Sequence, residues 1–489
     1  MAAMTAGLDA ADRSQRKRPM LPPTRSWRAL CLAAALVVLA PAAATGIASA
    51  TERAGRGHPR VTTTVLQVPA DGPEMDPSEP HIAVDPNDPK HRFAVAQVGP
   101  PENRHEFLWR TDDAGKSWTR SPLLGGSDNS PDGIGLDPAV AAGGHGLVLY
   151  GTIAGEIDVA AGTATVQAGT RVSTDGGASF TDFGSADQAT LPLCVIAGSC
   201  LPPPGSRFVD KPWLAIDTTG GAFSGAAYLV WTRLHLDTGR HEVLVAVSKD
   251  QGRTYGPPIL VDTLSQVERG ELDELAQVVV RPDGTVDVVW NGVRHGQPVI
   301  LHAWSIDGGA SFSAAEIVVR LRPDASREGI VTSLAASPRR RLALCWQQAR
   351  SPDRNDPRVA CKVMAKRGRW GPQQAILPHN RDRQHLPVAT FQGERLWVAA
   401  YVSSATLTRL VAVGATGHHF GHPLTVNRWP IPSQRICGPV PPACPEGGTF
   451  IGDYIGMVAA GRHLVVAYIQ PSADPSEPNR VLVSSFGPG

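Results

Sequence analysis

The feature that most constrains this chain is an eight-residue pattern that occurs four times. Each copy begins with Ser or Thr, has Asp at its third position and Gly at its fifth, and ends in an aromatic residue. This chemistry predicts a tight turn, because the carboxylate can accept from nearby backbone N–H groups and Gly permits positive φ. The aromatic residue then re-enters a sheet as a packing anchor. The copies span residues 111–118, 173–180, 248–255 and 305–312, with Asp113, Asp175, Asp250 and Asp307 as their acids.

Between these turns the sequence has the pattern of short β-strands. Val, Leu and Ile alternate with polar residues, which is the period of a half-buried or buried strand, and no long stretch has convincing helical periodicity. The 50 Gly and 43 Pro are spread along the chain, which fits many strands joined by many turns. The strongest predicted strands are 92–98, 146–153, 226–232, 286–293, 341–348, 395–402 and 462–469.

Two later segments keep the frame of this unit without its acidic turn. Residues 368–371 and 417–421 each place an aromatic residue directly before a Gly, as Tyr255 stands before Gly256. With a last unit from 453 to 486, the count of units is seven. The last unit lacks an outer strand, which the segment 62–68 can supply to close a ring. Because radial repetition of four-stranded sheets protects their edges, we predict an all-β propeller of seven blades, with six as the alternative.

The repeated turns resemble the Asp-box, or BNR repeat, of the sialidase-like β-propellers. The resemblance extends over nearly all of residues 60–489 and is to secreted bacterial proteins of the exo-α-sialidase family. It implies that the boxes are structural turns between the outer strands of a blade, away from the central pocket. Similar boxes occur in secreted hydrolases, sorting receptors and assembly factors, so the motif predicts a fold and leaves function open.

The first fifty residues have the features of a signal peptide. Six Lys and Arg residues form a basic leader, an apolar run follows from 29 to 38, and Ala48-Ser49-Ala50 offers small residues for cleavage. The alternative is an uncleaved N-terminal anchor. We expect a signal peptide at 1–50, a short flexible segment at 51–60 and a propeller at 61–489.

Removal of the leader leaves 40 basic and 43 acidic residues. Near-neutral charge without a basic stripe argues against nucleic acid or an anionic membrane as the main partner. The expected partner is an extracellular glycan or glycoconjugate, and the expected state is a monomer.

Six cysteines remain after the leader and fall into three close pairs. Local disulfides that pin loops are the simplest arrangement, whereas no Cys-x-x-Cys or paired Cys/His spacing supports a metal site. The predicted pairs are Cys194–Cys200, Cys345–Cys361 and Cys437–Cys444.

Candidate functional residues stand where the innermost strand of each unit begins, since these starts converge on the axis of a propeller. An acidic or polar residue recurs there, and such a ring can bind hydroxyl-rich or cationic ligands. The alternative is that an Asp before a Pro or a strand caps a turn. The candidates at these starts are Glu79, Asp137, Asp210, Lys211, Glu274, His385, Asp453 and Tyr454.

Resemblance to the sialidases implies a sharper set of roles. Their enzymes hold the substrate carboxylate with three arginines and use a Tyr as nucleophile and an Asp as acid/base. By order along the chain, Tyr454 with Asp453, Asp210 and Glu79 are the catalytic candidates, and Arg207 and Arg435 are candidate arginines.

The stretch 79–84 lacks the arginine of the family's first inner strand, which argues against sialic-acid hydrolysis. The two hypotheses are therefore an exo-acting glycoside hydrolase and a non-catalytic propeller that binds glycan or protein.

No cofactor is expected. An oxygen-rich loop, with Asp128, Asn129, Asp132 and Asp137, is a candidate for a structural calcium ion, although it lacks EF-hand spacing.

Overall fold

The computed structural model describes residues 60–68, 76–99, 105–121, 133–181, 183–196, 198–263, 274–321, 332–351, 354–365, 368–416, 419–436 and 448–487. The predicted signal peptide and all of the segment 51–60 except Arg60 lie outside these ranges. The described residues are almost entirely strands, together with a short helix α1 (Leu193–Ile196) and a 3-10 turn η2 (Ser433–Arg435).

The strands form seven antiparallel sheets, or blades, each of which runs from an inner to an outer edge. Blade 1 contains β2 (Pro77–Val84), β3 (Arg92–Val98), β4 (His105–Thr111) and β5 (Thr119–Ser121). Blade 2 contains β6 (Gly133–Gly144), β7 (Leu147–Asp158), β8 (Thr163–Ser173) and β9 (Gly184–Pro192). Blade 3 contains β10 (Arg207–Ile216), β11 (Ala227–His235), β12 (Arg240–Ser248) and β13 (Ile259–Thr263).

The next three blades follow the same order along the chain. Blade 4 contains β14 (Glu274–Val280), β15 (Val286–Arg294), β16 (Gln297–Ser305) and β17 (Glu316–Arg320). Blade 5 contains β18 (Thr332–Ala336), β19 (Leu342–Ser351), β20 (Arg354–Met364) and β21 (Gln374–Ala375). Blade 6 contains β22 (Arg383–Gln392), β23 (Arg395–Ser403), β24 (Leu407–Thr416) and β25 (His419–Phe420), and β26 (Leu424–Thr425) and β27 (Ile431–Pro432) also pair with β24.

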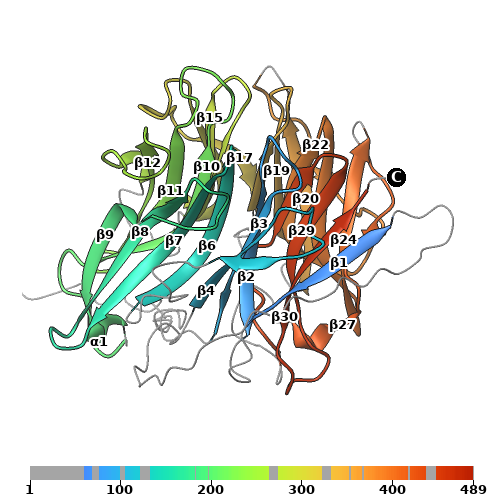
Figure 1. The fold of residues 1–489 in the computed structure, drawn as a ribbon, viewed down its shortest axis with the longest axis horizontal. Coiled ribbons are helices and arrows are strands. Elements are labelled where there is room, and N and C mark those ends of the chain that lie inside the picture. The colour runs from blue at the N-terminus through green and yellow to red at the C-terminus, as the bar shows by residue number, and fades with distance from the viewer. Residues whose placement is uncertain are drawn as a thin grey trace, which may run out of the picture.

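The seventh blade closes the ring with strands from both ends of the chain. It contains β28 (Gly456–Ala460), β29 (His463–Gln470) and β30 (Arg480–Phe486), and β1 (Val61–Leu66) pairs antiparallel with β30 as its outer strand. Figure 1 shows the blue β1 beside the orange-red β30. The inner strands of neighbouring blades contact one another all round the ring. The predicted all-β propeller and its closing strand are therefore confirmed, and the blade number is seven.

The four boxes are turns between the third and fourth strands of blades 1 to 4. In the first box, Asp113 accepts from Lys116 N at 2.8 Å, from Ser117 N at 3.0 Å and from Ser117 Oγ at 2.6 Å. Partial burial raises the pKa of Asp113, but these hydrogen bonds outweigh it and bring the pKa to about 2. The carboxylates of Asp175, Asp250 and Asp307 make the same kind of contacts. Each of these acids therefore holds its own turn.

Blades 5 and 6 keep the frame of the unit after losing the acid. The residue after the aromatic anchor donates its N–H to the third strand in every case: Gly256 N to Val247 O at 3.0 Å, Gly371 N to Val363 O at 2.9 Å, and Gly421 N to Gly414 O at 3.0 Å. The backbone pairing alone therefore maintains the turn where the box is absent.

The hydrophobic core lies between the blades, where the second strands are almost wholly buried. Large aromatic residues in the middle or later part of these strands fill the gaps, and each buries about 150–250 Å². Their indole N–H groups are hydrogen-bonded, as in Trp231 Nε1 to Asp187 Oδ2 at 3.0 Å and Trp290 Nε1 to Asp262 Oδ2 at 3.1 Å. The buried side chains include Trp231, Trp290, Trp346, Tyr401 and Tyr468.

Two of the three predicted disulfides are present, Cys194–Cys200 and Cys345–Cys361. The second joins residues that pair directly across β19 and β20 and are buried in the core. The expectation that these bridges pin only loops is therefore wrong for this pair. Cys437 and Cys444 lie outside the described residues.

No helix in the described part of the chain is long and apolar enough to cross a membrane.

Candidate functional site

The inner strands share a β-bulge near their starts, and one residue of each bulge has a left-handed backbone. The φ angles are 53° at Glu79, 58° at Asp137, 52° at Lys211, 53° at Leu275 and 50° at Leu386. Register shifts mark each bulge in blades 1, 2, 3, 4 and 6. Residues other than Gly rarely adopt this conformation, and at functional sites it is used to aim a side chain.

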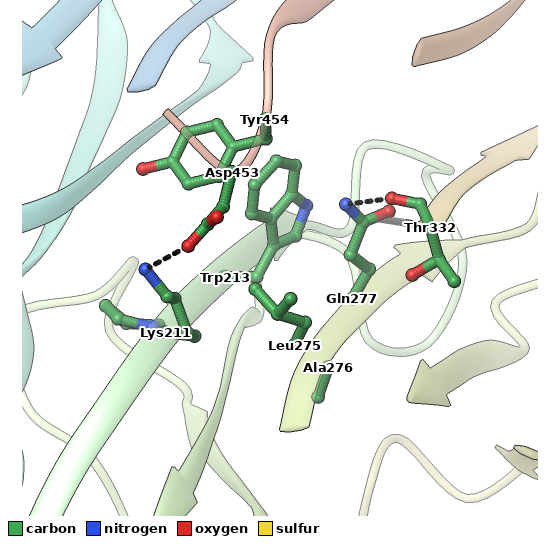
Figure 2. A pocket seen from close by; sticks show the side chains of 9 residues that line it. Lys211, Trp213, Leu275, Ala276, Gln277, Thr332, Asp453 and Tyr454 are labelled. Carbon is green, nitrogen blue, oxygen red and sulfur yellow. Dashed lines mark hydrogen bonds and ion pairs between the residues drawn. The ribbon is translucent and has the colours of Figure 1, made fainter. Parts of the chain in front are cut away.

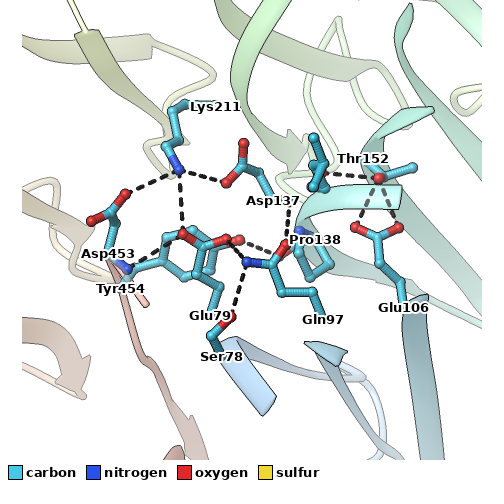
Figure 3. Close-up of polar contacts among 11 residues, drawn as sticks. Ser78, Glu79, Gln97, Glu106, Asp137, Pro138, Thr152, Lys211, Asp453 and Tyr454 are labelled. Carbon is cyan, nitrogen blue, oxygen red and sulfur yellow. Dashed lines mark hydrogen bonds and ion pairs between the residues drawn. The ribbon is translucent and has the colours of Figure 1, made fainter. Parts of the chain in front are cut away.

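In blades 1 to 3 the left-handed residues meet one another. Lys211 Nζ lies 2.5 Å from Asp137 Oδ1, 3.3 Å from Glu79 Oε1 and 3.0 Å from Asp453 Oδ2 of blade 7 (Figure 3). We call Glu79, Asp137, Lys211 and Asp453 the axial cluster. Four separate blades supply its members, so only the closed ring assembles it.

Blade 7 reaches the cluster because Gly452 has no side chain. A Cβ at Gly452 would lie 2.4 Å from the backbone nitrogen of Glu79, and its φ of 108° also favours Gly. This close approach places the Asp453 N–H 3.4 Å from Glu79 Oε1.

Gln97 of β3 supports the two carboxyl groups from behind. Its Nε2 donates to Glu79 Oε2 at 2.6 Å and to Ser78 Oγ at 3.0 Å, while its Oε1 accepts from Asp137 N at 3.2 Å. That last contact satisfies a backbone N–H within the bulge of β6. Gln97 therefore fixes both bulges relative to each other.

Burial and charge separate the protonation states within the axial cluster. Burial raises the pKa of Glu79 well above its usual range; Lys211 opposes this, while the charges of Asp137 and Asp453 add to it. Burial also disfavours the Lys211 ammonium, but the surrounding carboxylates outweigh it and raise its pKa well above the usual range. Glu79 therefore retains a proton more readily than an ordinary carboxyl, and Lys211 stays charged.

Aromatic rings form one wall beside the cluster. Trp213 makes edge contacts with Tyr454 at 5.3 Å and with His81 at 4.6 Å between ring centroids. Tyr454 Oη donates to Pro138 O at 2.9 Å, and burial together with nearby carboxylates raises the pKa of its phenol. Burial lowers the pKa of His81 to about 4, and its Nδ1 accepts from Val140 N. Both rings are therefore neutral near pH 7.

A small pocket opens between this wall and blades 4 and 5 (Figure 2). Its space for water-sized groups is about 10 Å³, which suits a single water molecule or a group of similar size. Among the described residues, the buried Thr332 Oγ1 has no hydrogen-bond partner. The pocket is lined by Lys211, Pro212, Trp213, Leu275, Ala276, Gln277, Thr332, Asp453 and Tyr454.

The structure brings together five of the residues singled out from the sequence. Asp210 is near enough for its charge to raise the pKa of Lys211. The residues that meet are Glu79, Asp137, Lys211, Asp453 and Tyr454.

Other candidates make their described contacts elsewhere. His385 Nε2 pairs with Ser403 Oγ at 2.9 Å, and Arg435 Nε donates to Ser472 O at 2.8 Å. Arg207 begins β10 opposite His235, and Glu274 begins β14 opposite Asn291. No contact among the described residues links Arg207 or Arg435 to the axial cluster, so the arginine clamp implied by the sialidase resemblance is not assembled from these two.

Sequence reasoning missed the residues that support the site from second strands and from a neighbouring blade. Gln97 and Gln277 are the clearest, and each is the one amide side chain in a strand that is apolar apart from its first residue. Glu106 was also missed; it accepts hydrogen bonds from Thr152 and Tyr150. A polar residue in a buried strand was the available signal.

The predicted calcium loop cannot be assessed as a whole, because residues 128–132 lie outside the described ranges. Asp137, its remaining member, is ion-paired with Lys211. Among the described residues, no group of three or more His, Cys, Asp and Glu is arranged to hold a metal. The calcium ion stays a prediction.

No protein-family model matches the chain, and no curated protein matches its sequence. Solved structures do match. An α-L-arabinanase of Penicillium chrysogenum, complexed with arabinobiose, is 14% identical with a TM-score of 0.40, over 90% of this chain and 98% of that chain. A mutant NanB sialidase of Streptococcus pneumoniae is 10% identical with a TM-score of 0.42, over 87% and 70%. An ulvan lyase is 9% identical with a TM-score of 0.48, over 83% and 93%. At these identities the likeness concerns the fold alone.

Proposed function

We propose that the protein is a secreted, exo-acting glycoside hydrolase whose reaction takes place at the axial cluster. The observation that carries the proposal is the contrast between two neighbouring carboxyl groups: burial raises the pKa of Glu79, while Asp453 is ion-paired with Lys211 at the pocket. Glycoside hydrolysis needs one carboxyl that gives a proton and one carboxylate that attacks or stabilises the sugar.

Asp453 is the carboxylate that faces a substrate. Its side chain is 20% exposed, against 7% for Asp137 and 1% for Glu79, and it lines the pocket. Glu79 and Asp137 share a hydrogen bond, so this pair serves as the acid. Tyr454 remains a protonated phenol in this scheme and forms the wall of the site, because its hydroxyl is engaged with Pro138 O.

The spacing of the carboxyl groups favours a reaction with retention of configuration. Asp137 Oδ1 and Asp453 Oδ2 lie 2.5 and 3.0 Å from the same ammonium, so they are no more than 5.5 Å apart. Retaining hydrolases have carboxyl groups about 5–5.5 Å apart, and inverting enzymes have a wider gap.

The full chain, expressed with its own leader, is to be assayed on a panel of chromogenic glycosides that includes a sialoside. We expect turnover of a non-sialoside, with kcat lowered about 10²–10⁴-fold in Asp453→Asn and in Glu79→Gln. Asp112→Asn is the matched control, since this acid lies exposed in the first box. N-terminal sequencing of the secreted product tests cleavage after Ala50, which the two described disulfides favour.

A non-catalytic glycan-binding propeller is the second candidate. The observation that favours it is that Lys211 engages all three carboxyl groups around a space of about 10 Å³. If no glycoside is turned over, but a glycan binds and binding is lost in Asp453→Asn, the hydrolase proposal fails and the binding function replaces it.

A further inference from the structure

The charge balance of the axial cluster determines which ligands it can accept. Three carboxyl groups surround one ammonium, so the formal charge is −2 when all are ionised and −1 when Glu79 is protonated. Asp210 adds a further negative charge close to Lys211. Among the described residues, no arginine charge shifts the pKa of Glu79, Lys211 or Tyr454.

Lys211 cannot neutralise a ligand anion in addition to these carboxylates. A lysine ammonium has three N–H donors, and three carboxylate oxygens already lie around Nζ at 2.5, 3.0 and 3.3 Å. An incoming carboxylate would have to displace one of them and leave a buried negative charge without its partner.

The acceptor that remains for a ligand is on Asp453. Its Oδ2 contacts Lys211, and the described residues donate no hydrogen bond to its Oδ1. Thr332 supplies an independent sign of a missing ligand group. Its side chain is buried, lines the same pocket, and leaves Oγ1 without a partner among the described residues. A buried hydroxyl without a partner is costly, so a polar group in the pocket would stabilise the site.

The size of the pocket favours the same kind of ligand group as its charge does. The space for water-sized groups in the pocket is about 10 Å³, so a primary ammonium or a hydroxyl fits there more readily than a carboxylate. Trp213 offers an aromatic surface at the same mouth, and aromatic rings attract both sugar faces and cations.

We infer that the axial site selects sugars that carry a protonated amine, which Asp453 accepts in the pocket that Thr332 also lines, and that it rejects sugars that carry a carboxylate. This inference rests on the proposed function, because it names the substrate class of the same site. Amino sugars are thus the expected ligands, hydroxyl-only sugars are weaker ones, and sialic and uronic acids are excluded.

The test is calorimetric titration of the full chain with glucosamine, glucose and glucuronate at about pH 6, where a sugar amine is protonated. We expect glucosamine to bind at least about tenfold more tightly than glucose, which corresponds to about 1.4 kcal/mol, and glucuronate to bind more weakly than glucose. The preference for glucosamine should weaken with added salt and disappear in Asp453→Asn, but persist in the exposed control Asp112→Asn.

Hydrolysis assays on the matched glucosaminide, glucoside and glucuronide separate this inference from the proposed function. Preferential binding of glucosamine without turnover supports the inference and refutes the hydrolase. Turnover of neutral or anionic glycosides without a preference for the amine supports the hydrolase and refutes the inference. Binding of glucuronate as tight as that of glucosamine, or no binding of glucosamine, overturns the inference.

Discussion

The two sides of the propeller axis use one backbone device for opposite chemistry. On one side, the left-handed residues of blades 1 to 3 are Glu79, Asp137 and Lys211; on the other, those of blades 4 and 6 are Leu275 and Leu386. We call these the charged side and the apolar side. Leu386 is buried in the core and Leu275 lines the pocket, whereas the charged residues form an ion-paired cluster.

The bulges on both sides receive the same backbone support. Gln97 Oε1 accepts from Asp137 N at 3.2 Å, and Gln347 Oε1 accepts from Leu386 N at 3.1 Å. Each amide comes from the second strand of the preceding blade. The bulge is therefore part of the architecture, and only the side chain placed on it decides whether a blade contributes to the site.

The largest expected effect is a loss of unfolding free energy when the charged side is altered, compared with the matching change on the apolar side. Among the described residues, Lys211 is the cation that contacts the buried Glu79 and Asp137 and the partly exposed Asp453, and Lys211→Met removes it; loss of one partner of a buried ion pair costs about 3–5 kcal/mol. Leu275→Met at the matching bulge is its control and should cost less than about 1.5 kcal/mol, because it preserves volume. Urea unfolding at pH 7 measures both free energies. Equal losses in the two variants would show that the cluster is not held by its charge.

A smaller difference is expected for the two supporting amides. Gln97→Leu removes the hydrogen bonds that Gln97 makes with Glu79 Oε2, Ser78 Oγ and Asp137 N, and it should cost about 2–3 kcal/mol. Gln347→Leu leaves Leu386 N without one and should cost about 1–2 kcal/mol. If the two costs coincide in urea unfolding, the carboxyl contact adds nothing to the backbone role.

The smallest effect is a pH dependence on the apolar side. Burial, assisted by the charge of Arg383, lowers the pKa of His385 to about 3. The unfolded chain takes up a proton near pH 6.5 and the folded chain does not, so the contribution is complete above pH 6.5 and declines as the pH falls. Between pH 6.5 and 5.5 the wild type should lose about 1 kcal/mol more than His385→Asn.

Thermal or urea unfolding across this pH window measures the difference, and His145→Asn is the control because its side chain is exposed. A wild-type profile no steeper than that of His385→Asn would contradict the assignment.

Much of the fold could be predicted because it depends on local sequence patterns, namely strand periodicity and the repeated turn. The strands predicted at 92–98 and 395–402 match β3 and β23 within one residue, and the unit frame was recognised even in blades 5 and 6. The inner-strand starts were also found, since Pro and acidic residues mark them. The contributions of Gln97, Thr332 and Gly452 could not be predicted, because each acts on a residue of another blade.

The sequence by itself determined the repeat, its turns and the residues that stand at the strand starts, because hydrogen bonding in turns and side-chain period depend on neighbours along the chain. Only the tertiary structure decided which of those residues meet. Glu79 and Asp453 are separated by almost the whole propeller in sequence, and the contact of the inner strands β28 and β2 in the closed ring makes them neighbours around one ammonium. Closure of the ring also buries Glu79, and this burial raises the pKa of its carboxyl group well above the usual range.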